Sequence, residues 1–150
     1  MHTIQRMTGV AAFIVVAAVQ SLAVAAPDVR LATAAKNHDA ESVRTLLTEG
    51  VAVNATPPDG VTALHWAVQW NHEAMADLLI GAGAAVNAAD HYQVTPLALA
   101  CTNGSAGMVH RLLKAGADVN ATQATGETAL MTCARSGVVG AVRPLLARAV

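Results

Sequence analysis

The sequence contains few aromatic residues, little charge of either sign and few cysteines. Aromatic side chains make up 3% of the 150 residues although hydrophobic residues make up 54%. Much of the apolar content is therefore alanine, so the core depends on close approach of helices rather than on bulky side chains. The 9 Lys+Arg and 10 Asp+Glu form no basic run, which argues against a nucleic-acid partner. Two cysteines are too few for a dense disulfide framework.

The sequence also lacks the short patterns that carry chemistry. His72 and Glu73 begin a stretch like H-E-x-x-H, but Ala76 stands where a zinc protease has its second histidine. Ser105 in NGSAG does not have the glycine spacing of a nucleophile elbow. The glycine-rich GAGAA at 81–85 lacks the third glycine of a dinucleotide loop. We therefore expect no catalytic residues, no cofactor and no metal site, and we expect that the protein is not an enzyme.

The N-terminal segment at 1–25 differs from the rest of the chain. It contains Arg6 and no acid, then an unbroken apolar run at 10–19, then small residues with an A-x-A pattern at 23–25. This order predicts a secretory signal peptide that is cleaved after residue 25. The alternative is an uncleaved anchor, for which the apolar run is short of the roughly 20 residues that span a membrane. We expect residues 26–150 to form the mature domain, exported to a bacterial periplasm or secreted, and free of the membrane after cleavage.

The same residues recur every 33 positions between residues 31 and 146. The recurring residues are Leu31, Leu64, Leu97 and Leu130, then Gly50, Gly83 and Gly116, then Asn54, Asn87 and Asn120. No insertion breaks this register. A fixed period of this length indicates units that cannot bury their own apolar faces and that stack to share one core.

Each unit predicts two short helices, an extended piece and a turn. Side-chain oxygens are placed to cap the first helix at Thr62, Thr95 and Thr128. Pro96 occupies the first helical position, where its missing N–H costs nothing. The turn between the helices falls at His38, Asn71, Gly104 and Gly137. The glycine at 50, 83 or 116 ends the second helix.

These units resemble the ankyrin repeat. The best matches are TALHWAV at 62–68, TPLALAC at 95–101 and GADVNA at 116–121. The four copies cover residues 25–56, 57–89, 90–122 and 123–150. The resemblance implies an all-α solenoid of helix-turn-helix units with short hairpin-like turns. It also implies that His65 bonds between neighbouring repeats, and that the protein is a cofactor-free scaffold for protein–protein interaction.

The first and last copies depart from the pattern. The first has VRLATAA as its opening, with Asp28 expected to cap the helix, and is typical of a terminal unit whose outer face meets water. The last has Gly140 and Pro144 within its second helix. A proline in a helix interior costs about 3 kcal/mol, so we expect this helix to be weak, kinked or frayed. Its apolar outer face is then either an imperfect cap, which we favour, or a patch for a partner or a second copy.

In ankyrin repeats, the turn tips and the exposed side of the first helices form a concave surface that binds other proteins. Carried over to this sequence, the candidate partner-binding residues are Asp59, Gln69, Trp70, His91, Tyr92, Asn103, Glu127 and Arg135. Trp70 and Tyr92 are two of four aromatic residues, and both types are favoured binding anchors. The alternative for Trp70 is a partly buried residue that covers the neighbouring repeat. We expect Trp66 to pack in the core and His110 to face solvent.

Cys101 and Cys133 replace alanines at the close contact between helices. A disulfide is conceivable in an exported protein. We expect two small buried residues instead, because neighbouring repeats stack roughly 10 Å apart whereas a disulfide needs Cα atoms within about 7 Å. The two cysteines also fall one place apart in the repeat.

The sequence thus favours a monomeric scaffold that binds another protein. The alternative function is an inhibitor or immunity-type protein that binds and blocks an enzyme of the cell envelope. An enzyme or metal protein is least favoured, because no acid, nucleophile or ligand set converges.

Overall fold

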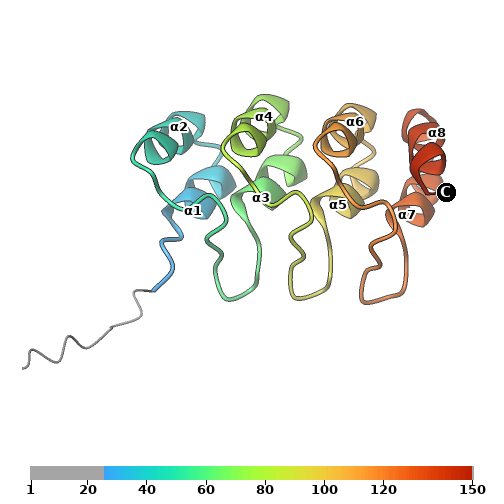
Figure 1. The fold of residues 1–150 in the computed structure, drawn as a ribbon, viewed down its shortest axis with the longest axis horizontal. Coiled ribbons are helices and arrows are strands. Elements are labelled where there is room, and N and C mark those ends of the chain that lie inside the picture. Colours follow the sequence, from blue (N-terminus) through green and yellow to red (C-terminus); the bar gives the residue numbers. More distant parts are fainter. Residues whose placement is uncertain (1–25, 150) are drawn as a thin grey trace, which may run out of the picture.

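A computed structural model describes residues 26–149, so the predicted signal peptide at 1–25 lies outside the described residues. Eight helices and no named strand occur in the described part of the chain. The helices form two layers, with the first helix of each pair in one layer and the second in the other (Figure 1). Hairpin-like loops extend from the layer of first helices. The fold is the predicted all-α repeat solenoid.

The helix bounds repeat with the period of the sequence. The first helices are α1 (Arg30–Lys36), α3 (Ala63–Gln69), α5 (Pro96–Thr102) and α7 (Ala129–Arg135). The second helices are α2 (Ala40–Thr48), α4 (Glu73–Gly81), α6 (Ala106–Lys114) and α8 (Val139–Arg148). Residues one sequence period apart therefore occupy equivalent places in consecutive repeats. Between residues 26 and 149, no helix is long and apolar enough to cross a membrane.

The predicted threonine caps are confirmed. The side chains of Thr62, Thr95 and Thr128 each accept a hydrogen bond from the backbone N–H three residues later. The cap predicted for the first repeat is wrong, because α1 begins after Val29, which is the equivalent of Thr62 one period earlier. Asp28 lies one residue before Val29, and its carboxylate accepts from the N–H of Arg30 (3.1 Å) and pairs with the Arg30 guanidinium.

The turns between paired helices use left-handed backbone at the predicted residues. Positive φ angles occur at His38, Asn71, Gly104 and Gly137. A further series, which the sequence analysis did not identify, lies at the loop tips and comprises Gly60, Gln93 and Gly126. A Cβ at Gly60 would lie 3.2 Å from the Cα of Asp90 in the next loop. Glycine there lets neighbouring loops approach closely.

Polar contacts tie each loop to the next repeat. Asn54 accepts from the N–H of Ala85 (2.7 Å) and donates to the carbonyl of Gly83 (3.2 Å). Asn87 repeats the same two bonds one unit later. At the tips, the N–H of His91 donates to the carbonyl of Asp59 (3.1 Å), and the N–H of Ala124 donates to the carbonyl of Tyr92 (3.1 Å). The loops are therefore fixed relative to one another.

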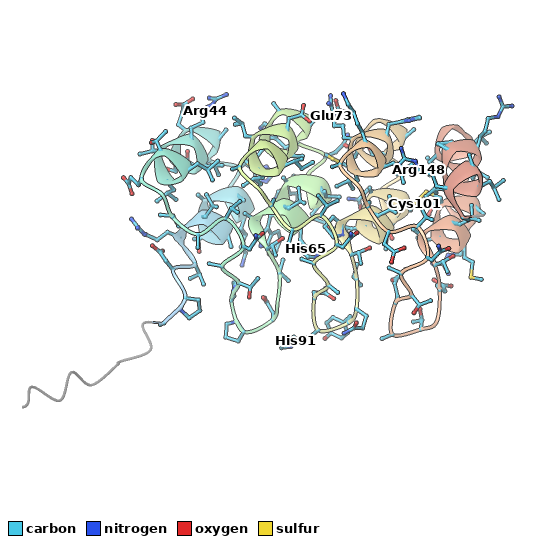
Figure 2. The ribbon with its side chains drawn as sticks, in the orientation of Figure 1. Arg44, His65, Glu73, His91, Cys101 and Arg148 are labelled. Carbon is cyan, nitrogen blue, oxygen red and sulfur yellow. A yellow bond between two sulfur atoms is a disulfide. The ribbon has the colours of Figure 1, made fainter. Side chains whose placement is uncertain are left out.

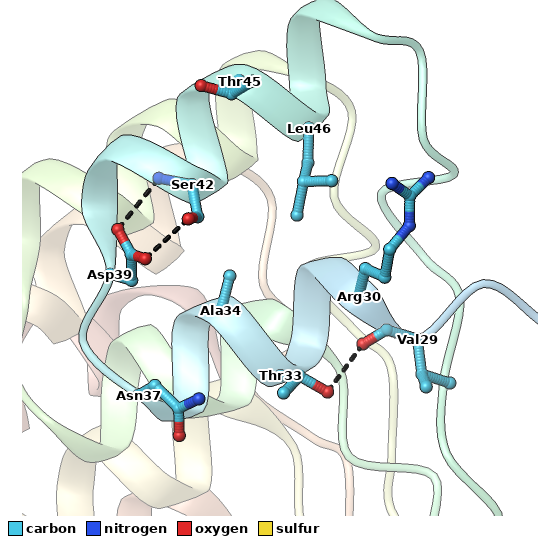
Figure 3. A pocket seen from close by; sticks show the side chains of 9 residues that line it. All are labelled: Val29, Arg30, Thr33, Ala34, Asn37, Asp39, Ser42, Thr45 and Leu46. Carbon is cyan, nitrogen blue, oxygen red and sulfur yellow. Dashed lines mark hydrogen bonds between the residues drawn. The ribbon is translucent and has the colours of Figure 1, made fainter.

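The two ends of the stack differ in polarity. At the first repeat, a groove of about 470 Å³ opens between α1 and α2 (Figure 3). Its lining includes the polar side chains of Thr33, Ser42 and Thr45. The equivalent positions in the next repeat are Trp66, Met75 and Leu78. The first repeat is thus a polar terminal unit, as the sequence indicated.

The last helix is continuous, so the expectation that it is frayed is wrong. Helix α8 runs continuously from Val139 to Arg148 with Pro144 inside it. Two contacts hold α8 on the stack: Leu145 is buried, and the Arg148 guanidinium donates to the carbonyl of Leu113. A Cβ at Gly140 would lie 3.3 Å from the Cβ of Ala106, so this glycine lets α8 approach α6 closely.

The outer face of the last repeat is apolar and poorly covered, as expected. Met131 is 57% exposed and Leu146 is 51% exposed. One period earlier, the equivalent residues Ala98 and Leu113 are buried. The last described repeat therefore presents to solvent the positions that other repeats use for stacking.

Candidate interaction surface

The eight candidate partner-binding residues lie on the side of the molecule formed by the loop tips and by α3, α5 and α7, which we call the loop face. Figure 2 shows His91 at the tip of one loop. Seven of the eight side chains are exposed and Glu127 is half-buried. The loop face therefore presents the predicted residues to solvent.

Trp70 belongs to an aromatic cluster that joins the first two repeats. The Trp66 and Trp70 rings stack with centroids 6.2 Å apart, because residues four apart share one helix face. The ring of His38 lies 4.4 Å from that of Trp70, and Lys36 Nζ lies 5.3 Å from the Trp66 centroid. Trp70 is 43% exposed, so it both covers the neighbouring repeat and remains accessible.

Tyr92 is the most exposed aromatic side chain in the described part of the chain. It is 75% exposed, yet its backbone is held at both polar atoms. Its N–H donates to Asp90 Oδ1 (2.8 Å) and its carbonyl accepts from Ala124 (3.1 Å). The ring thus projects from a backbone fixed by its neighbours, which lowers the entropy lost when a partner binds.

A small cleft lies beside the aromatic cluster, between the second and third repeats. It has a volume of about 160 Å³ and is lined by Val61, His65, Trp66, Gln69, Asp90, Val94 and Leu99. We call it the Trp66 cleft. The expectation that Trp66 packs in the core is therefore wrong in part, because the indole is half-buried and forms a wall of this cleft.

His65 joins two repeats at the base of the loops, as the resemblance implied (Figure 2). Its Nδ1 accepts from the N–H of Thr62 (3.1 Å), so the neutral ring carries its proton on Nε2. That nitrogen donates to the carbonyl of Val94 in the next repeat (3.0 Å). Burial lowers the pKa of His65, although the nearby charges of Asp90 and Asp59 act in the opposite direction.

Two family models match the chain. A model of ankyrin repeats in three copies matches residues 18–90, and a model of ankyrin repeats in many copies matches residues 78–132. Together they span residues 18–132, which is more than half of the 150 residues. Residues 18–132 thus match ankyrin repeats. A search of curated proteins found no match.

Ankyrin repeats are generally protein–protein interaction modules and typically non-enzymatic scaffolds. In this ankyrin-repeat protein, no group of three or more His, Cys, Asp or Glu within residues 26–149 is arranged to hold a metal ion. His110 is exposed on the outer surface of α6, as expected. The loop face, with its exposed aromatic residues, is thus the candidate functional site.

Several candidate residues already make contacts within the ankyrin stack. The amide of Asn103 donates to the carbonyls of Val68 and Gln69, both at 3.2 Å. Arg135 pairs with Glu127. Asn103 thus joins two neighbouring repeats, whereas the Arg135–Glu127 pair lies within the last one. A partner that bound these polar groups would replace existing hydrogen bonds.

The cysteines form a disulfide, so the expectation of two separate buried thiols is wrong. The sulfur atoms of Cys101 and Cys133 are bonded, and their Cα atoms are 4.4 Å apart. The helix-packing distance of 8–10 Å applies to axes, and Cα atoms lie about 2.3 Å from each axis, so facing Cα atoms approach to about 3–5 Å. Cys101 faces forward along the stack and Cys133 faces backward. Their separation of 32 residues, one fewer than the period, is therefore consistent with a bond between neighbouring repeats.

We expect His65 to make the stability of the protein fall as pH falls below about 6.5, the pKa of a free histidine. Below that value the unfolded chain takes up a proton, whereas the folded His65, whose pKa is lowered, stays neutral. The loss continues until pH reaches the folded pKa and then levels off, while above pH 6.5 the full stability is present. Thermal unfolding measured from pH 8 to pH 5 checks this.

The matched variant is His65→Gln, whose amide can accept from Thr62 and donate to Val94 without titrating. Its unfolding temperature should fall less steeply with decreasing pH than that of the wild type. Equal slopes for the two proteins would show that another group causes the pH dependence.

Proposed function

We propose that this ankyrin-repeat protein is exported and binds a partner protein through its loop face. The observation that carries the proposal is the exposure of Trp70 (43%) and Tyr92 (75%) on this face. Aromatic residues make up only 3% of the chain, and burying them in the core would stabilise a fold that is otherwise rich in alanine. Their placement at the surface favours recognition, because Trp and Tyr dominate binding energy in protein interfaces.

The way the loops are held also supports this proposal. The backbone bonds from His91 to Asp59 and from Ala124 to Tyr92 fix each tip against the next. A surface that is already ordered loses little conformational entropy on association, so more of the contact energy contributes to affinity. The scaffold thus displays side chains in fixed positions, and the identity of those side chains selects the partner.

We expect the double variant Trp70→Ala, Tyr92→Ala to lose at least about tenfold in affinity for the partner, because each aromatic anchor contributes over about 1 kcal/mol. The measurement is affinity capture by residues 26–150 from an extract of the native cell envelope, followed by titration of the captured protein. The helical circular dichroism spectrum should stay unchanged, since both side chains project from the surface.

The control is Val139→Ala, Leu146→Ala, which removes two exposed apolar side chains from α8 instead. This variant should capture the partner as the wild type does. Loss of capture by the α8 variant, together with normal capture by the Trp70/Tyr92 variant, would place the binding surface at the end of the stack.

Export is supported by two independent features. Residues 1–25 have the order of a signal peptide, and the disulfide between Cys101 and Cys133 is of the kind that persists in oxidising compartments. Mass spectrometry of the protein from its native cells should give a chain that begins at Ala26 and contains the disulfide. A chain that retains Met1 and both thiols would contradict export.

The alternative of an inhibitor or immunity-type protein shares this surface. Where the captured partner is an enzyme, its activity with and without added protein separates blocking from tethering.

A further inference from the structure

We infer that the Trp66 cleft receives an arginine side chain of the partner protein. Its guanidinium lies against the indole of Trp66 and donates to the carboxylate of Asp90. This inference names the chemistry that the loop face recognises, and it rests on the function proposed above.

The size and walls of the cleft fit one long side chain. Its volume of about 160 Å³ is well below the 300–1,000 Å³ that is usual for small-molecule sites. Val61, Val94 and Leu99 provide apolar walls beside the indole. The methylene stem of an arginine can pack on such walls while its charged end reaches a polar rim.

The carboxylate of Asp90 borders the cleft, and that of Asp59 lies outside the lining but near His65. Asp90 Oδ1 accepts from the N–H groups of Tyr92 (2.8 Å) and Val94 (2.9 Å), whereas Oδ2 accepts no hydrogen bond from residues 26–149. Asp59 Oδ1 accepts from the N–H of Val61 (3.0 Å). Neither carboxylate forms an ion pair within the described residues, and both are close enough to His65 to favour its charged form.

Most of the other acidic side chains in the described part of the chain form an ion pair with an arginine, whereas Asp90 and Asp59 do not. Those paired with an arginine are Asp28, Glu41, Glu49, Glu73, Asp77 and Glu127. The cation next to the cleft is Lys36, which lies over the Trp66 ring from the first repeat. The cleft itself is formed by the second and third repeats. An unpaired carboxylate beside an aromatic wall is thus left for a cation from outside.

A guanidinium fits this arrangement better than an ammonium. It is planar, so it can stack on the indole and direct several N–H groups sideways at the same time. Asp90 Oδ2 and the side-chain carbonyl of Gln69, which is exposed at the rim, are two acceptors for those groups. Hydrogen bonds from a charged donor to a carboxylate are among the stronger ones in proteins.

The test titrates residues 26–150 with N-acetyl-arginine methylamide and follows the indole N–H signals of Trp66 and Trp70 by NMR. We expect saturable shifts of the Trp66 signal with a dissociation constant of about 1 mM, typical of a ligand of this size. N-acetyl-citrulline methylamide, which has the same shape and no charge, should bind at least about tenfold more weakly.

Asp90→Asn is the matched variant, because its side-chain oxygen can still accept from Tyr92 and Val94. We expect it to weaken arginine binding by about tenfold or more. Asp118→Asn is the control, since Asp118 also accepts from a backbone N–H, that of Asn120 (2.9 Å), and lies outside the cleft. It should bind arginine as the wild type does.

Three results would overturn the inference: no shift at Trp66, equal binding of the citrulline probe, or normal arginine binding by Asp90→Asn. Equal affinity for N-acetyl-lysine methylamide would overturn the assignment to a guanidinium. None of these results would contradict the proposed function, because the wild type should still capture the partner and the Trp70/Tyr92 variant should still lose it. Conversely, arginine binding together with normal capture by that variant would refute the proposed function while the cleft still binds arginine.

Discussion

Replacing Cys101 and Cys133 together by alanine should lower the free energy of unfolding by about 3–4 kcal/mol. The disulfide closes a loop with a sequence separation of 32 residues, and the chain-entropy relation for a loop of that length gives this magnitude. Alanine suits both positions, because the equivalent residues Ala35 and Ala100 are buried alanines. The loss should therefore reflect the missing bond rather than poor packing.

Urea unfolding with and without a reducing agent measures this effect. The wild type should lose stability when reduced, whereas the double variant should unfold at the same urea concentration in both conditions. Both cysteines are fully buried, so reduction should first require opening of the last repeat. A wild-type protein whose midpoint is unchanged after verified reduction would contradict a stabilising role for the bond.

Leu113→Ala should cost about 2–5 kcal/mol, whereas Leu146→Ala should cost less than about 1 kcal/mol. The two leucines occupy the same place in consecutive repeats. Leu113 is 3% exposed because the last repeat covers it, whereas Leu146 is 51% exposed because no described repeat follows. The pair therefore isolates the energy of stacking one repeat on the next, with helix position and residue type held constant.

The same urea experiment gives both values. Equal losses for the two variants would mean that the leucine stabilises its own helix pair and that stacking contributes little. A larger loss at Leu146 would mean that its exposed face is covered in solution, for example by a second copy of the chain.

The strict period made most of the fold predictable. Because no insertion breaks the register, the helices and caps of one well-matched repeat predict those of the others. The caps at Thr62, Thr95 and Thr128 follow in this way. The same reasoning located the turns at His38 and Asn71, where the residue type alone is a weaker indication than glycine. Local chemistry and period agreed at these places.

The period was less informative where the structure depends on contacts between repeats. The spacing of helix axes does not predict the disulfide, because the backbones of packed helices approach more closely than their axes do. The sequence does not predict that α8 is continuous, because the cost of Pro144 is local whereas Leu145 and Arg148 contact the rest of the stack. In α8, the helix persists despite what the local sequence favours.

The site could be predicted as a surface but not as a set of contacts. The exposure of Trp70 and Tyr92 follows from their place in the repeat. The use of Asn103 to bond the carbonyls of α3 does not, because an amide at a helix end can equally well face solvent. Nor does the sequence show that Trp66 and Asp90, from different repeats, border one cleft.

Recognition through the loop face is tested most directly by photo-crosslinking. A photo-reactive amino acid is placed at Tyr92 in one protein and at Leu146 in another, and each is irradiated with the partner. Both side chains are exposed, so either could report contact. If the partner binds the loop face, position 92 gives a cross-linked product and position 146 gives none. Cross-linking from position 146 alone would contradict recognition through the loop face.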